Sequence, residues 1–401
     1  MRKLVFLELA LALLARSDLQ AGPIEDLKPG EWLEVQNSHL EDVKADPEQF
    51  PWVAWGEGIS GIINDWCSGA FDTKRDRLYI GPCGGHSGYF GNEVYAFDLN
   101  DLKWHRLTDP NPIVSVECPD ASKYPCAIHT YDGLEYIPPP VDRLVQVGGW
   151  DADNTYALDL DKLVWEVNSP AKQGRTGDVA AWDPGTGLLW IQFNGYAGSG
   201  RLFTWDPVKD VWNGRSDRVI FEYCKTATVD YTRRKMVAVG NCHPGRVLTW
   251  TLAPTGGDIY PEVIQTTGST EITDSSNPGL EYDPVSDRII AWNGGRNVFS
   301  FDLDTNVWTK HTGRGADPGP PASNGTYGRF RYSPSKNVFV LVNDVRKNVF
   351  IYKHTDTLPR YHGGLPPTDL RIRKGPREPK SSSPLVVNTL AGKILKQRGV
   401  P

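Results

Sequence analysis

A sequence unit that recurs six times constrains the possible folds of this chain more than any other feature. Each copy contains a short strand pattern, a polar turn, a strongly apolar strand pattern and a break at Gly or Asn. Two examples are "SGAFDTKRDRLYIGPCGGH" from Ser68 and "GLEYDPVSDRIIAWNGGR" from Gly279. The other copies begin at Gly133, Asp178, Thr226 and Gly328. Successive copies start about 45 to 65 residues apart, and repetition at such a period indicates stacked, similar structural units.

The second half of the unit also recurs. Segments such as "NEVYAFDLNDLKWHRL" and "NVFSFDLDTNVWTKH" combine a third strand pattern, an Asp-containing turn and a fourth strand that opens with tryptophan. Four antiparallel strands per unit are typical of a β-propeller blade, so the chain is predicted to be an all-β propeller. A single blade cannot bury both of its faces, and we expect each fourth-strand tryptophan to pack against a neighbouring blade.

The two ends of the repeat region predict how the ring closes. The sixth copy stops after three strand patterns at "NVFIYKHT", which ends at Thr355. Near the N-terminus, "GEWLEVQNS" (residues 30–38) matches the Trp-led fourth strand, so we predict that it completes the last blade. This count gives six blades, and segments without a readable pattern leave room for a seventh. We expect the propeller to span residues 23–357, with the Pro- and charge-rich residues 358–401 as a C-terminal extension.

Composition agrees with this architecture. By length alone, 401 residues allow one large domain or two ordinary ones. The 14 tryptophans, 40 glycines and 31 prolines favour short strands joined by turns. The formal net charge of -6 is spread without long single-sign blocks, which argues against nucleic acid as a partner. We expect a monomer that contacts neither nucleic acid nor a membrane.

Residues 1–22 have the layout of a secretory signal. A basic start at Arg2 and Lys3 precedes an apolar stretch and then small residues near Ala21. The alternative is a buried N-terminal helix. No later segment is apolar enough to cross a bilayer. The signal predicts a secreted or periplasmic protein.

The six cysteines support export from the cytoplasm. Their spacing favours three local disulfides, Cys67–Cys83, Cys118–Cys126 and Cys224–Cys242, as the simplest of the fifteen possible pairings. The alternative is six separate thiols in a cytosolic protein. No CxxC pair with the spacing of a metal finger is present.

Blade topology predicts which polar residues share one face. If strands a to d run from the centre outward, the b–c loops and the d–a connections emerge on the same side. Turns on the opposite side, such as "DTKRD" and "SPSKN", contain ordinary turn formers. The b–c and d–a segments instead carry His, Tyr, Arg and Asn, and Asp65 and Asn277 are among the residues that precede a strand a. This asymmetry predicts a functional face.

This mixture of side chains suits one reaction class. Elimination of a substituent from a uronic acid needs a base, an acid and donors that neutralise the carboxylate, and His, Tyr, Arg and Asn supply them. The candidate catalytic residues are His86, His129, Tyr131, Tyr196 and Tyr223. The candidate substrate-binding residues are Tyr89, Asn92, Trp150, Arg175, Asn194, His243, Arg246, Arg296 and Arg329. The sequence requires no cofactor and leaves open a divalent metal held by His86, His129 and His243.

The stretches "GGHSGYFGNEVYAFDL" and "HTYDGLEYIP" resemble bacterial secreted proteins of the kelch type, and the blade pattern resembles kelch-like propellers across residues 60–355. That group includes propeller polysaccharide lyases, such as ulvan lyases, and related enzymes acting at rhamnose–glucuronic acid linkages. The resemblance implies a catalytic histidine at His86 or His129. It also implies a partner at Tyr131, Tyr196 or Tyr223 and an arginine that clamps the carboxylate. Those enzymes mostly have seven blades, whereas six units are counted here.

The resulting expectation is a secreted carbohydrate-active enzyme, a polysaccharide lyase that cleaves an acidic polysaccharide or oligosaccharide by β-elimination. Two alternatives stay open. One is a non-catalytic kelch-type propeller that binds glycans or proteins, and the other is a glycosidase acting at a rhamnose–glucuronate linkage. Copper chemistry of the galactose-oxidase type fits less well, because no convincing Tyr/His ligand set is present.

Overall fold

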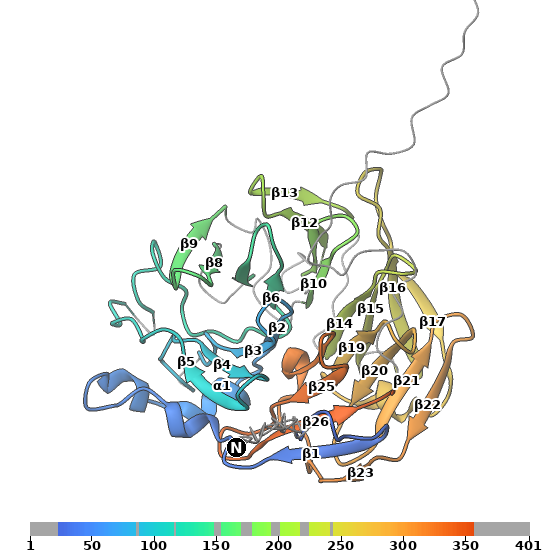
Figure 1. Cartoon of the computed structure of the whole chain (residues 1–401). Helices are drawn as coiled ribbons and strands as arrows, with labels where there is room; N and C mark the ends of the chain where they lie inside the picture. The colour runs from blue at the N-terminus through green and yellow to red at the C-terminus, as the bar shows by residue number, and fades with distance from the viewer. Residues whose placement is uncertain are drawn as a thin grey trace, which may run out of the picture.

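Six β-sheets are arranged radially in a closed ring, with one edge strand of each sheet at the centre (Figure 1). This arrangement comes from a computed structural model, which describes residues 23–85, 88–115, 118–147, 154–169, 179–193, 201–216, 224–240 and 244–356. The six-bladed propeller predicted from the repeat is confirmed, and no seventh blade is present in this part of the chain.

Blades 1 to 3 each have four antiparallel strands in chain order. Blade 1 comprises β2 (Gly69–Asp72), β3 (Arg77–Ile80), β4 (Tyr95–Asp98) and β5 (Lys103–Arg106). Blade 2 comprises β6 (Leu134–Ile137), β7 (Arg143–Gln146), β8 (Thr155–Asp159) and β9 (Val164–Asn168). Blade 3 comprises β10 (Val179–Asp183), β11 (Leu188–Gln192), β12 (Leu202–Asp206) and β13 (Val211–Gly214).

Blades 4 and 5 keep this order, whereas the N-terminal strand is the fourth strand of blade 6, and the last two blades gain a short parallel edge strand. Blade 4 comprises β14 (Lys225–Asp230), β15 (Lys235–Gly240), β16 (Arg246–Thr251) and β17 (Glu262–Gln265). Blade 5 comprises β19 (Gly279–Asp283), β20 (Arg288–Trp292), β21 (Val298–Asp302), β22 (Val307–His311) and the edge strand β18 (Thr267–Gly268). Blade 6 comprises β24 (Phe330–Ser333), β25 (Val338–Leu341), β26 (Val349–Lys353), β1 (Glu31–Val35) and the edge strand β23 (Arg314–Gly315).

The N-terminal strand closes the ring, as the sequence predicts. Strand β1 pairs antiparallel with β26, in a register that joins Glu31 to Lys353 and Val35 to Val349. In Figure 1 the blue β1 therefore lies beside the orange β26, although the two strands are far apart in sequence. This pairing uses the hydrogen-bonding edge that three strands alone would leave open on blade 6.

The short helices lie outside the repeat. They are η1 (Leu40–Val43), η2 (Pro51–Ala54), η3 (Gly58–Ser60), α1 (Gly61–Asn64), η5 (Thr270–Asp274) and η6 (Tyr327–Arg329). Helices α1 and η6 precede the central strands of blades 1 and 6 and therefore form part of the approach to the channel. No helix of the described segments is long and apolar enough to cross a membrane.

The apolar core fills the spaces between blades. One cluster joins blades 4 and 5 through Val237, Ile289 and Trp308, and equivalent clusters lie between the other neighbouring blades. Trp308 and Trp104 open fourth strands and are both buried, as expected for residues that cover a neighbour. The indole of Trp104 also donates a hydrogen bond to the Ser38 carbonyl at 2.9 Å, which fastens the N-terminal segment to blade 1.

Two of the three predicted disulfides are confirmed. Cys67 pairs with Cys83 and Cys118 pairs with Cys126, with Cα–Cα distances of 5.8 and 4.9 Å. The predicted partner of Cys224 is Cys242, which lies outside the described residues, so that pair stays a prediction. Disulfides form in oxidising compartments, and these two indicate an extracytoplasmic protein. The expected signal segment and C-terminal extension also lie outside the described residues.

Candidate functional site

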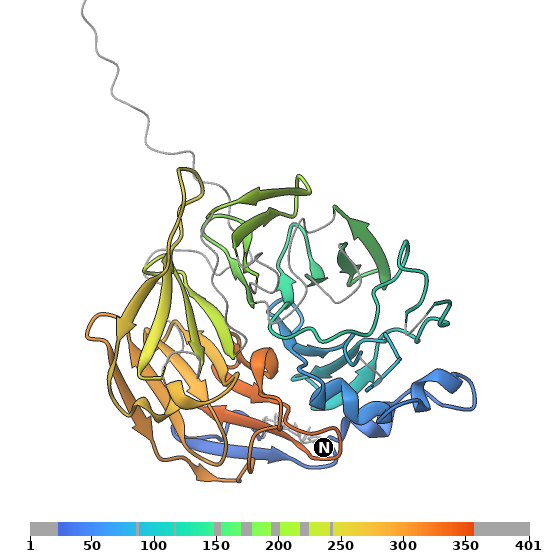
Figure 2. The same cartoon turned by 180° about the vertical axis from the view of Figure 1, so that it is seen from behind.

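The central channel has two ends of different chemistry. The innermost strand of each blade, namely β2, β6, β10, β14, β19 or β24, begins at one end and runs into the a–b turn at the other. These strands converge on the axis in both views of the ring (Figures 1 and 2). We call the end where they begin the channel mouth and the other the turn end. The Cys67–Cys83 disulfide joins a d–a connection to a b–c loop, so both kinds of segment meet at the mouth, as predicted.

A chain of aromatic rings lines the channel mouth. The imidazole of His129 lies 4.8 Å from the Trp66 ring and 5.8 Å from the Tyr131 ring, measured between centroids. Tyr131 in turn makes an edge contact with Tyr327 at 6.4 Å. We call these four residues the mouth cluster. Trp66 is 36% exposed and Tyr327 is fully buried, so the cluster runs from the surface into the molecule.

The backbone that presents the mouth cluster repeats from blade to blade. Trp66, Tyr131 and Tyr327 each stand three residues before a central strand, and their φ angles are 51°, 47° and 50°. This left-handed region is unfavourable for bulky residues, and such outliers concentrate at functional sites. The amide of Tyr131 donates to the Trp66 carbonyl at 2.7 Å, which ties the connection of blade 2 to that of blade 1.

A buried carboxyl group lies beside the mouth cluster. The Oδ2 atom of Asp65 has no hydrogen-bond partner, and it is packed so closely against Gly88 that a Cβ there would collide with it. Burial, assisted by the nearby charge of Glu57, raises the pKa of Asp65 to about 7. A carboxyl group that titrates near neutral pH can donate or accept a proton during catalysis.

A tight turn connects this carboxyl group to the backbone of the mouth histidine. The amide of Gly88 donates to the Gly85 carbonyl at 2.8 Å, and a Cβ on Gly85 would collide with the backbone just before His129. The two ends of such a turn lie within about 7 Å of each other. The loop therefore brings the surroundings of Asp65 and His129 together. His86 lies outside the described residues.

Three predicted binding residues have their side chains bound to the protein itself. Tyr89 is buried and donates to Glu93, and the Asn92 amide donates to the Pro125 carbonyl at 2.8 Å. Arg329 is fully buried and donates to the carbonyls of Cys67, Val342 and Gly325. These three contacts with backbone carbonyls hold together the segments that lead into blades 1 and 6. We therefore do not include Arg329 among the arginines that could bind a substrate carboxylate.

The other predicted residues divide into two groups. Arg246 begins β16, and Arg296 follows β20, where it donates to the Gly315 carbonyl at 3.0 Å and pairs with Asp317. The structure does not bring these two into the mouth cluster. The remaining candidates lie outside the described residues, and they are His86, Trp150, Arg175, Asn194, Tyr196, Tyr223 and His243.

Sequence reasoning missed Trp66 and Tyr327. Both belong to d–a connections, from which the prediction selected Tyr131 and Tyr223 but neither of these two residues. An available signal was the recurrence of an aromatic residue three positions before a central strand in "WCSG", "YDGL" and "YGRF". Since Trp66 contacts the His129 ring directly, this signal identifies the wall of the site.

The turn end holds a cavity of about 150 Å³, which the prediction of ordinary turns did not anticipate. Five of the six blades contribute an aromatic residue near the end of the central strand, namely Phe71, Tyr136, Trp182, Tyr282 and Tyr332. Glu135, Glu281 and Arg331 also line it. The signal was the repeated aromatic–X–Pro triplet in "YIP", "WDP", "YDP" and "YSP".

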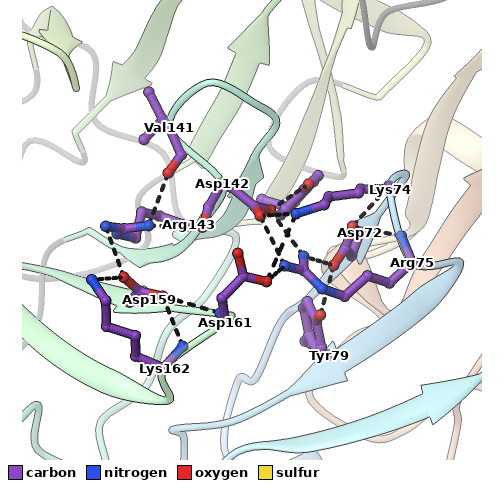
Figure 3. Close-up of polar contacts among 11 residues, drawn as sticks. Asp72, Lys74, Arg75, Tyr79, Val141, Asp142, Arg143, Asp159, Asp161 and Lys162 are labelled. Carbon is purple, nitrogen blue, oxygen red and sulfur yellow. Dashed lines mark hydrogen bonds and ion pairs between the residues drawn. The ribbon is translucent and has the colours of Figure 1, made fainter.

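Around this cavity, ion pairs join neighbouring blades. Arg75 of blade 1 reaches Asp72 at 2.8 Å, Asp142 of blade 2 at 2.8 Å and Asp161 at 2.5 Å (Figure 3). Figure 3 also shows Lys74 directed at Asp142 and Tyr79 directed at Asp72. The charges and hydrogen-bonding groups of these residues are paired with one another, and we assign them a structural role.

The described residues contain one group of side chains that could together hold a metal ion. The ligand atoms of Asp98, Asp101 and His105 lie within 4.8 Å of one another near the outer edge of blade 1. Asp98 already accepts hydrogen bonds from Arg77 and Asn100. This group is remote from the mouth cluster, so we assign it no role in the candidate site.

Comparisons with known proteins add information on fold alone. No family model matches the chain, and no curated protein matches it. Among solved structures, a protein of unknown function from Bacteroides thetaiotaomicron has 8% identity and a TM-score of 0.50, covering 80% of this chain and 75% of that one.

Two further solved structures are enzymes. A gluconolactonase from Xanthomonas campestris has 13% identity and a TM-score of 0.45, covering 73% of this chain and 87% of that one. A fungal alcohol oxidase in complex with copper has 11% identity and a TM-score of 0.45, covering 75% and 76%. At these identities and TM-scores the two structures carry no argument about this chain, and no lyase family is shown.

Proposed function

We propose that this protein is an extracytoplasmic enzyme that cleaves a uronic-acid-containing glycan by β-elimination at the channel mouth. The observation that carries the proposal is the His129 imidazole held between the rings of Trp66 and Tyr131, beside the buried carboxyl group of Asp65. Secreted or periplasmic location, expected from residues 1–22, would give such an enzyme access to polymers.

The two described proton-transfer groups suit the two halves of an elimination. One of His129 and Tyr131 removes the proton from the sugar carbon beside the carboxylate. The electron pair released forms the ring double bond, and the bond from the neighbouring carbon to the glycosidic oxygen breaks. The other group protonates that oxygen, so atoms and charge balance. Imidazole and phenol both serve in such transfers when they are held within reach of the reacting atoms.

Trp66 is suited to position the sugar. Its ring is partly exposed at the surface and contacts His129 on the inner side. A sugar ring lying against the exposed indole would bring its carbon atoms close to the imidazole. A flat, apolar surface with a polar neighbour is a common feature of small-molecule sites. The substrate carboxylate also needs a cationic partner, and Arg175, outside the described residues, keeps that predicted role.

Asp65 favours a second candidate, a glycosidase acting at the same type of linkage. A carboxyl group with a pKa of about 7 retains its proton near neutral pH and can protonate a leaving glycosidic oxygen. Hydrolysis by this route would release a saturated sugar, whereas elimination leaves a double bond. The products therefore distinguish the two reactions.

The test is incubation of the whole chain with a panel of glucuronate- and iduronate-containing polymers. Elimination produces a product with new ultraviolet absorbance and a mass that lacks the added water of hydrolysis. We expect this product from the unaltered chain and its loss in His129→Gln. The matched control is His105→Gln, because His105 is exposed on β5 and pairs with Asp101.

Three results would contradict the proposal. Saturated products would favour the glycosidase, and binding without any product would favour a non-catalytic propeller. Full activity of a folded His129→Gln variant would show that the reaction does not take place at the mouth cluster.

A further inference from the structure

We infer that the turn-end cavity binds a small organic cation, a protonated amine carried on a short apolar chain. The cavity lies at the opposite end of the channel from the mouth cluster, and this inference does not depend on the proposed enzymatic function. It rests on the wall, the floor and the size of the cavity.

The wall of the cavity offers ring surface rather than hydrogen-bonding groups. The hydroxyl groups of Tyr136, Tyr282 and Tyr332 are directed to the turns, where they donate to Asp142, Asp287 and Asn337 at 2.9, 2.7 and 2.8 Å. The aromatic rings are left to line the cavity. A ring of aromatic side chains attracts ammonium groups through cation–π interaction and accepts the apolar part of the same ligand.

The floor of the cavity carries more negative than positive groups. Arg331 lies between two carboxylates, with its guanidinium 3.0 Å from Glu281 and 3.1 Å from Glu135. Asp132 lies behind it at 3.9 Å. Three carboxyl groups thus face one guanidinium, and no other charged side chain lines the cavity among the described residues. An anionic ligand would meet this excess of carboxylate, whereas a cation would compensate it.

Protonation of the floor supports the same assignment. Burial raises the pKa of Glu135 to about 7 and that of Asp132 to about 8, although Arg331 opposes both shifts. Asp132 and Glu135 therefore hold protons for part of the time near neutral pH. An ammonium group would replace such a proton, because it restores the charge balance at the same place.

The exposure of the carboxylate side chains and the volume of the cavity both suit a small ligand. The side chains of Glu135 and Glu281 are 12% and 20% exposed, so both are accessible, whereas Arg331 is 4% exposed. The cavity volume of about 150 Å³ is well above the roughly 10–15 Å³ that a single water molecule needs. This space has room for a small amine on a short apolar chain.

The test is calorimetric titration of the whole chain with butylammonium, and with butanol and butyrate as matched neutral and anionic probes. We expect butylammonium to bind with a Kd of about 0.1–1 mM at about pH 8, and the other two probes to show no saturation in this range. Binding should weaken by about tenfold at about pH 5.5, where Glu135 and Asp132 hold more protons and Arg331 stays charged.

Two variants act on the cavity in different ways. Glu135→Gln removes one carboxylate and should weaken butylammonium by at least about tenfold. Thr73→Tyr fills the rim without altering any charge, and it copies Tyr231, the corresponding residue of blade 4, so we expect it to fold and to block binding. Glu166→Gln is the control, because Glu166 pairs with Arg143 away from the cavity and its loss should not change affinity.

The inference is overturned if butanol binds as well as butylammonium, if butyrate binds more tightly, or if none of the probes binds. It is equally overturned if folded Thr73→Tyr binds butylammonium like the unaltered chain. This last comparison decides the question even where Glu135→Gln lowers stability.

Discussion

The rim of the turn end and the channel mouth differ in whether the protein satisfies their polar groups, although the indole N–H of Trp182 inside the turn-end cavity is also buried without a partner. At the turn end, Arg75 and Arg233 each meet three aspartates from two neighbouring blades. At the mouth, Asp65 Oδ2, Asn277 Oδ1 and the Tyr327 hydroxyl are buried without a partner. Buried polar groups are normally paired, and exceptions point to function or to ligands. The difference indicates that the rim of the turn end stabilises the ring and that the mouth is available for chemistry.

The largest expected effect tests the mouth. His129→Gln should lower the rate of glycan cleavage by about 10²–10⁴-fold, the usual contribution of a positioned acid or base. The denaturation midpoint should change little, because His129 is only partly buried. Rates measured under saturating substrate, together with urea unfolding, check both statements. Equal cleavage rates for the His129→Gln variant and the unaltered chain would show that the channel mouth is not the reactive end.

The next effect tests the centre of the turn end. Arg331→Met leaves Asp132, Glu135 and Glu281 without their shared cation, and we expect a loss of about 3–5 kcal/mol in unfolding free energy. The loss should be smaller at about pH 5 than at about pH 8, because Asp132 and Glu135 are then protonated. Arg288→Met is the control, since its ion pair with Asp302 is near the surface and is worth about 0–1 kcal/mol. Equal losses in both variants would contradict this account.

A smaller effect tests the rim of the turn end by its internal symmetry. Arg233 meets Asp230, Asp287 and Asp304 at 2.8, 2.7 and 2.7 Å, the same arrangement that Arg75 makes three blades away. Arg75→Ala and Arg233→Ala should therefore cost similar amounts, about 1–3 kcal/mol each, because a buried aspartate loses a partner.

The control for this pair is Lys162→Ala. Lys162 is exposed beside Asp159, and such pairs contribute about 0–1 kcal/mol. Urea unfolding measures all three variants. A large loss in one arginine variant with none in the other would show that the two networks are not equivalent.

The smallest effect concerns the pH dependence of stability at the mouth. The pKa of Asp65 is higher in the folded protein, about 7, than in an unfolded chain, where it is about 3.9. The folded state therefore binds more protons between these values, and stability falls as the pH rises from about 4 to 7.

Asp65→Asn removes this dependence. The variant should gain on the order of 1 kcal/mol relative to the unaltered chain at about pH 8 and nothing at about pH 4. Unfolding free energies at the two pH values provide the measurement. A gain that is the same at both would show that Asp65 is not the titrating group.

The repeat made the propeller architecture predictable from the sequence. The residues that lie at each end of the channel could be predicted only in part. The strand that follows Gly30 could be assigned to the last blade because its Trp-led pattern matches the other fourth strands. The disulfides of Cys67 and Cys118 followed from local spacing. These features depend on periodicity and short separations, which a sequence displays directly.

The site depended on contacts that periodicity does not display. Arg329 was a candidate because of its place before β24, yet its guanidinium binds three carbonyls inside the ring. Glu135, Glu281 and Arg331 come from blades 2, 5 and 6 and meet only when the ring closes. Position along the chain predicted which end a residue would occupy, but it did not predict whether the protein itself would satisfy that residue.

A crystal structure of the chain with a bound uronic-acid oligosaccharide tests the central claim most directly. Our account predicts a sugar ring against Trp66, with the carbon beside its carboxylate facing His129 and Tyr131. An oligosaccharide bound at the outer edge of a blade, or at the turn end, would contradict it.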